Sequence, residues 1–168
     1  RMNLTRYLAG EVNLDKLDLH PQSWYQENQI ELYLKSPVTT VDPKQKIVRL
    51  ADGREFAYDT LLLTNGAHPF VPPIAGAQTP GVQTLRTLED ANAILAAMAQ
   101  PINVVCIGGG LLGLEVAGAI SRRGAKVTVV ESLAWLLPRQ LDEAASHILQ
   151  AKIEAMGIQV IVGARTQA

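Results

Sequence analysis

A cluster of glycines in the second half of the chain has the spacing that phosphate binding requires. Gly108, Gly110 and Gly113 follow the pattern G-x-G-x-x-G, directly after a largely apolar run of six residues that is typical of a buried strand. Gly108 permits a sharp turn, Gly110 leaves space for a pyrophosphate, and Gly113 lets the next helix lie against the strand. Free N–H groups at the start of that helix, at Leu111 and Leu112, would hold the phosphates. The alternative is a glycine-rich turn that binds no ligand.

A carboxylate follows the glycines at the distance expected for a dinucleotide site. Glu131 ends the next predicted strand, 23 residues after Gly108. A carboxylate at this place accepts hydrogen bonds from both hydroxyls of an adenosine ribose and repels a 2′-phosphate. No arginine follows until Arg139, and the sequence therefore favours NAD(H) over NADP(H). The alternative is an ordinary solvated glutamate at the end of a strand.

Glu115 is the single charged residue in the 19-residue run 102–120. The run is long enough to cross a membrane, but three consecutive glycines interrupt it, so we expect a strand, a turn and a helix instead. Two interpretations of Glu115 stay open. The start of a helix tolerates a carboxylate through the helix dipole. Alternatively, Glu115 faces a redox centre and pairs with a cation from another part of the protein.

The alternation of strands and helices after residue 101 predicts how these residues are positioned. Strands alternating with helices imply a parallel sheet, so we expect an α/β fold with a Rossmann-like, doubly wound parallel sheet. We predict strands at 102–107, 126–131 and 158–162, and helices at 111–123 and 142–156.

The residues before this unit predict a β-meander. Asp52-Gly53 is a two-residue turn signal between two strand-like runs, which predicts a hairpin. The run Leu61–Asn65 is short and apolar, and we expect a strand that is buried on both faces. Prolines and glycines between residues 69 and 81 indicate a domain boundary there or slightly later. Further strands are expected at 30–34, 39–41, 47–51 and 54–58, and a helix at 88–99.

Composition excludes several classes of function. The net charge is −1, so the chain has no basic field for a nucleic acid, and no secretory signal or membrane span is expected. Cys106 is the only cysteine, which excludes an intrachain disulfide, a CxxC pair and a zinc cage, and we expect it to be a buried core thiol. The three histidines are scattered, so we expect no metal site. A reducing, cytoplasmic setting fits this composition.

Several motifs together resemble one family. Residues 106–117 resemble the NAD-binding motif of the pyridine nucleotide–disulfide oxidoreductase superfamily, and residues 58–69 resemble its second FAD-contacting motif. Residues 86–90 resemble the linker into the NAD domain. The runs 137–142, 24–25 and 71–74 are similar to the flavoprotein modules of assimilatory nitrite reductase large subunits and rubredoxin reductases. The resemblance spans essentially all 168 residues.

This resemblance implies an NAD(P)H-dependent flavoprotein oxidoreductase that passes hydride from NADH to FAD, and electrons on to an acceptor such as a nitrite reductase or rubredoxin-type centre. Thr64, Asn65 and Gly66, which replace the family's Ala-Thr-Gly, would contact FAD. The resemblance also implies an ion pair near the flavin between Glu115 and a cation, for which Arg6 is the candidate. Residues 1–98 would then be a partial FAD-binding domain, and 99–168 the NAD-binding βαβαβ unit.

The family's first glycine-rich motif, which holds the FAD pyrophosphate, does not occur in this sequence. We therefore expect an internal part of a longer enzyme that is inactive by itself, and a homo-oligomer because the edge of the 61–65 strand is left open. Two alternatives stay open. One is a non-catalytic NAD-sensing module, against which the hairpin-rich stretch 30–58 argues. The other places FAD itself at Gly108, although about a hundred residues precede that glycine.

Overall fold

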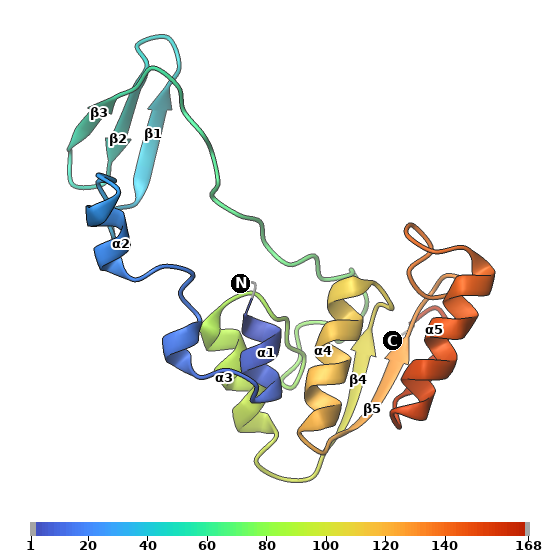
Figure 1. Ribbon diagram of the computed structural model, residues 1–168. Coiled ribbons are helices and arrows are strands. Elements are labelled where there is room, and N and C mark those ends of the chain that lie inside the picture. Colours follow the sequence, from blue (N-terminus) through green and yellow to red (C-terminus); the bar gives the residue numbers. More distant parts are fainter. Residues whose placement is uncertain (1–2, 167–168) are drawn as a thin grey trace. The chain divides into compact units, whose positions relative to one another are not determined.

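The computed structural model describes residues 3–166, and their elements form two compact units (Figure 1). One unit combines the segment that ends at Leu17 with the segment that begins at His68. The other unit is Asp18–Ala67. The first helix of the chain thus lies in the same unit as the glycine motif, while the assignment of residues 1–98 and 99–168 to two cofactors stays a prediction.

The larger unit contains a parallel sheet of three strands in the order β4-β5-β6. Its strands are β4 (Asn103–Ile107), β5 (Lys126–Val130) and β6 (Gln159–Ile161). Helix α4 (Leu111–Arg122) connects the first two strands, and α5 (Glu143–Ala155) connects the last two. This arrangement confirms the predicted Rossmann-like α/β class, with element ends within two residues of those expected.

The core of this unit forms where α4 packs on the central strand β5. Val129 is completely buried and Val127 nearly so, and both belong to the core that β5 forms with α4. Ala117 on α4 is also buried, and its small side chain allows the helix to approach the sheet closely. The strand β4 is buried on one face only, because Val105 and Ile107 are 61% and 51% exposed.

Two further helices belong to this unit. Helix α1 (Leu4–Ala9) packs against α4 and against α3 (Leu88–Ala97), as Figure 1 shows. Leu8 is completely buried in the core, and the guanidinium of Arg123 donates a hydrogen bond of 2.9 Å to the Leu8 carbonyl. A short 3₁₀ helix at Leu14–Lys16 follows. Within residues 3–166 no helix has both the length and the hydropathy that crossing a membrane requires.

The smaller unit contains one short helix and an antiparallel sheet. Helix α2 (Gln22–Glu27) precedes β1 (Val38–Asp42), β2 (Ile47–Leu50) and β3 (Glu55–Ala57), which pair in the order β1-β2-β3. Gly53 in the predicted turn has a φ of +88°, a conformation that suits glycine. The predicted β-meander is therefore confirmed.

Two predicted strands are wrong. Residues 30–34 form no strand: the Ile30 N–H closes the end of α2 on the Tyr25 carbonyl, and Tyr33 packs its ring against Phe56. Residues 61–65 are irregular, and the side chains of Leu62 and Leu63 are 81% and 68% exposed. A strand needs a neighbour to satisfy its backbone groups, and in the described residues this segment pairs with none.

Candidate dinucleotide-binding site

The turn after β4 requires glycine at two positions for different reasons. Gly108 has a φ of +106°, and its N–H donates a hydrogen bond of 2.8 Å to the Val130 carbonyl on the neighbouring strand. A Cβ atom at Gly113 would collide with the carbonyl oxygen of Gly108. The first turn of α4 therefore lies directly on the turn that leaves β4.

The start of α4 is open, whereas the starts of α3 and α5 are capped by side chains. The Thr87 hydroxyl accepts a hydrogen bond from the Asp90 N–H on α3, and the Asp142 carboxylate accepts one from the Ala145 N–H on α5. Gly110 is the N-cap of α4 and has no side chain that could cap the helix, and a Cβ atom at this position would point into open space. Unpaired N–H groups at a helix start attract an anion.

The residues of the first turn frame this opening. Leu111 and Leu112 follow the N-cap directly, and their side chains are 60% and 48% exposed. Their N–H groups are among those that no intrahelical partner can satisfy. The predicted residues of the glycine motif thus lie together around one helix start that no side chain caps.

Glu131 lies beside this loop, immediately after β5, and is only 8% exposed. One carboxylate oxygen, Oε2, accepts a hydrogen bond of 2.8 Å from the Gly109 N–H. The other, Oε1, accepts bonds of 2.8 Å from the Leu133 N–H and 3.3 Å from the Ser132 hydroxyl. A carboxylate offers about four acceptor positions, so room for a further donor remains. In the structure, the residue that is predicted to bind the ribose therefore lies against the loop that is predicted to bind the phosphates.

Comparison with known proteins assigns the family. The family described as pyridine nucleotide-disulphide oxidoreductase matches residues 6–168. The chain belongs to this family. It is 36% identical over 167 residues to the nitrite reductase [NAD(P)H] of Bacillus subtilis. The aligned region covers 99% of this chain and 21% of that protein. It is 34% identical over 159 residues to the rubredoxin-NAD(+) reductase of Ectopseudomonas oleovorans, covering 95% of this chain and 41% of the relative.

Solved structures of similar proteins agree with this assignment. A ferredoxin reductase from Rhodopseudomonas palustris superimposes with a TM-score of 0.88 at 28% identity, covering 99% of this chain and 41% of that one. The chain thus spans between about one fifth and two fifths of the length of these proteins.

The ion pair that the oxidoreductase family implies between Arg6 and Glu115 is not formed here. The Arg6 guanidinium lies 3.3 Å from the Glu11 carboxylate, which also pairs with Arg122. Glu115 is exposed on α4 and forms no ion pair with any residue of the described range 3–166. Because water solvates the Glu115 carboxylate, it needs no cation, and Arg6 takes the partner that is five residues away on its own segment.

The residues that the oxidoreductase family assigns to FAD lie in the smaller unit. Thr64, Asn65 and Gly66 are exposed and have no regular secondary structure, and Gly66 has a φ of +77°. Among the described residues, no hydrogen bond connects the side chains of Thr64 and Asn65 to each other or to another residue. These three residues by themselves do not form a site that fits FAD.

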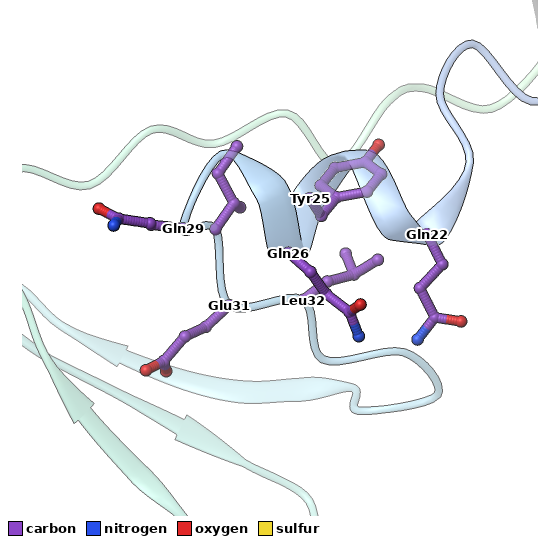
Figure 2. A pocket seen from close by; sticks show the side chains of 7 residues that line it. Gln22, Tyr25, Gln26, Gln29, Glu31 and Leu32 are labelled. Atoms are coloured by element: carbon purple, nitrogen blue, oxygen red, sulfur yellow. The ribbon is translucent and has the colours of Figure 1, made fainter.

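The smaller unit also has a hollow of about 450 Å³ between α2 and the segment that follows it (Figure 2). Figure 2 shows side chains from both elements around it, and none belongs to the glycine motif. Its lining consists of Gln22, Tyr25, Gln26, Gln29, Ile30, Glu31 and Leu32. The hollow therefore lacks the helix start and the buried carboxylate that distinguish the candidate dinucleotide site.

Cys106 lies within β4, just before the glycine turn. Its side chain is partly buried and packs against the core. Burial raises the pKa of the thiol from 9.0 to about 11, so Cys106 stays protonated near neutral pH. Among the described residues, no group of three or more His, Cys, Asp or Glu side chains could hold a metal ion.

The glycine pattern did not single out Gly109, which lies within the loop, or Leu136 and Leu137, which contact Gly109. Gly109 occupies a position that the glycine pattern leaves free, and its N–H is bound to Glu131. The Leu137 N–H donates to the Gly109 carbonyl at 3.3 Å. The one available signal was the middle glycine of the run 108–110, because the pattern G-x-G-x-x-G does not require a glycine at position 109.

Proposed function

We propose that this chain forms the NADH-binding part of an NAD(P)H-dependent flavoprotein oxidoreductase. In the complete enzyme, hydride would pass from NADH to FAD, and electrons would continue to an acceptor such as a nitrite-reducing or rubredoxin-type centre. The names of the relatives support this proposal, since they are a nitrite reductase [NAD(P)H] and a rubredoxin-NAD(+) reductase. The chain's share of their length leaves the acceptor to other parts of such a protein.

The observation that carries the proposal is the uncapped start of α4 next to the buried carboxylate of Glu131. The helix start supplies N–H donors and a positive dipole end for the two phosphates. Glu131 supplies an acceptor for the hydroxyls of the adenosine ribose. A dinucleotide presents these two chemical groups in this order, so one ligand satisfies both features.

The surroundings of Glu131 favour NADH over NADPH. The Ser132 hydroxyl bonds the carboxylate at 3.3 Å, and it can rotate away so that a ribose hydroxyl takes its place. A 2′-phosphate in that position would face a buried negative charge. None of the residues 132–138 is lysine or arginine, so no nearby cation in that segment offsets this repulsion.

FAD, when bound, would accept the hydride, and the described residues contribute to a different part of the reaction. The glycine loop would fix the pyrophosphate and Glu131 the ribose, which together orient the dinucleotide. Since Thr64–Gly66 do not form a flavin site by themselves, the role of the described residues is to bind and orient the dinucleotide.

Titration calorimetry with NADH and NADPH tests the nucleotide assignment. NADH should bind more tightly, and Glu131→Ala should weaken NADH by about tenfold or more, because hydrogen bonds to a charged group contribute roughly 1.5–3 kcal/mol. NADPH should lose less, so the gap between the two narrows. Glu143→Ala, which removes the same charge from the exposed start of α5, should leave both affinities unchanged. Equal or tighter binding of NADPH by the unmodified chain contradicts the role of Glu131.

A second variant tests the phosphate loop itself. Gly110 has a φ of −79° and a ψ of 173°, a conformation that valine also adopts, and its surroundings are open. Gly110→Val should therefore fold normally while its branched side chain fills the place of the pyrophosphate. We expect NADH binding to become undetectable at concentrations that saturate the unmodified chain. A folded variant with unchanged affinity would rule out this loop.

A further inference from the structure

We propose that Glu131 and Gly109 are positioning residues that hold the glycine loop in its phosphate-binding shape. The carboxylate would then act on both halves of the adenosine diphosphate: directly on the ribose, and through Gly109 on the pyrophosphate. This inference rests on the proposed nucleotide site and extends it, because ribose recognition alone requires no contact between Glu131 and the loop.

The peptide groups on both sides of Gly109 are held by the segment that follows β5. The Gly109 N–H donates a buried hydrogen bond of 2.8 Å to Glu131 Oε2. The Gly109 carbonyl accepts a hydrogen bond of 3.3 Å from the Leu137 N–H. Gly109 directly precedes the N-cap Gly110, so these two bonds hold the residue from which the chain enters α4.

Close packing supports the same contact. A Cβ atom on Gly109 would lie 2.5 Å from Leu136 Cδ2 and 3.0 Å from the Cβ of Glu131. Leu136 is completely buried, so its side chain cannot move into solvent to make room. Glycine at this position therefore lets the loop lie flat on Glu131 and Leu136.

The residue that donates to the Gly109 carbonyl has an unusual backbone. Leu137 has a φ of +51°, a left-handed conformation that is unfavourable for leucine. Such a conformation persists only when its surroundings fix it. The turn at Leu137 also receives N–H bonds from Gln140 and Leu141, both at 2.9 Å, which stabilise it against the loop.

Removing the charge of Glu131 should have opposite effects on phosphate binding if Glu131 positions the loop and if it only binds the ribose. A negative carboxylate near a phosphate site repels the phosphate, so removing its charge should strengthen the binding of any ligand that does not use the ribose hydroxyls. If the carboxylate also holds the loop, its removal should weaken that same ligand. A nucleotide without ribose hydroxyls therefore reports on the loop alone.

The probes are ADP and 2′,3′-dideoxy-ADP, titrated by calorimetry into the 168-residue chain and into Glu131→Gln. The amide keeps the size of the side chain, but its NH₂ group cannot accept the second N–H bond. We expect Glu131→Gln to weaken dideoxy-ADP by about tenfold, and ADP by more. Unchanged or tighter binding of dideoxy-ADP would overturn the inference, because Glu131 would then act on the ribose only.

A second, independent experiment tests the packing contact between Gly109 and Leu136. Gly109→Ala should weaken ADP strongly, because its Cβ displaces the loop from Leu136, and adding Leu136→Ala should restore part of the affinity. Leu136→Ala alone, with circular dichroism and thermal unfolding for every variant, gives the reference for lost packing. ADP affinity in Gly109→Ala equal to that of the unmodified chain would contradict the inference. If the Leu136 variants do not fold, the Glu131→Gln titration decides.

Different results would refute the positioning role of Glu131 and the nucleotide site itself. An unmodified chain that binds neither ADP nor NADH would refute the nucleotide site and the inference together. Normal ADP binding, with dideoxy-ADP insensitive to Glu131→Gln, would leave the site in place and remove only the positioning role.

Discussion

The loop after β4 requires glycine at several positions, each for a different reason. Some of these reasons can be predicted from the sequence and others cannot. The spacing of Gly108, Gly110 and Gly113 was sufficient to predict a turn, an open approach and a close contact with α4. Gly109 was not predictable in the same way. Its hydrogen bond and its packing partner come from Glu131 and Leu136, more than twenty residues later in the chain.

At the scale of single residues, the partly buried thiol of Cys106 gives a prediction about pH. Its pKa is raised from 9.0 to about 11 by burial, so in the folded chain the reactive thiolate forms only at high pH. The rate of alkylation by iodoacetamide should rise with pH toward about 11. The same chain unfolded in denaturant should react about a hundredfold faster at pH 8, since two pKa units separate the two states. A midpoint near 9 in the folded chain contradicts this account.

Elements whose pattern is local were predicted best. The helices α4 and α5 each end next to a glycine with positive φ, Gly124 and Gly157, and both ends were predicted within a residue or two. The runs 30–34 and 61–65 have the composition of strands but form none. Strand formation depends on a neighbouring strand, and composition does not reveal whether a chain supplies one.

The capping box at the start of α3 predicts a loss of stability on substitution. The Thr87 hydroxyl accepts a hydrogen bond from the Asp90 N–H, and the Asp90 carboxylate accepts bonds from the N–H groups of Arg86 and Thr87. Thr87→Ala should lower the free energy of unfolding by about 1 kcal/mol, measured by urea denaturation. Thr87→Ser keeps the hydroxyl and should lose much less. Equal losses in both variants would show that the cap is not the cause.

Across the whole molecule, the residues of the proposed nucleotide site lie together as the sequence predicted, whereas Arg6 and Glu115 form no ion pair. The site depends on a βαβ unit whose parts follow one another in the chain. The ion pair would instead have to join α1 and α4, and Glu11 gives Arg6 a partner that is closer in sequence. A motif within one local unit is therefore a firmer basis for prediction than a contact between distant segments.

Exposed apolar side chains predict that the chain associates with itself. Leu62, Leu63 and Phe70 are 81%, 68% and 83% exposed, and exposed apolar surface promotes association. Light scattering at rising concentration should show oligomers. Replacing Leu62 and Leu63 with serine should shift the equilibrium toward the monomer without a loss of folded structure. A clean monomer at high concentration would contradict the prediction.

The proposed nucleotide site holds NADH at the start of α4, with its adenosine ribose on Glu131. A crystal structure of the chain with NADH tests it most directly. We expect the pyrophosphate within hydrogen-bonding distance of the N–H groups of Leu111 and Leu112, and a ribose hydroxyl on the Glu131 carboxylate in the place of the Ser132 hydroxyl. A nucleotide bound elsewhere, for example in the hollow beside Tyr25, with the glycine loop empty, would contradict it.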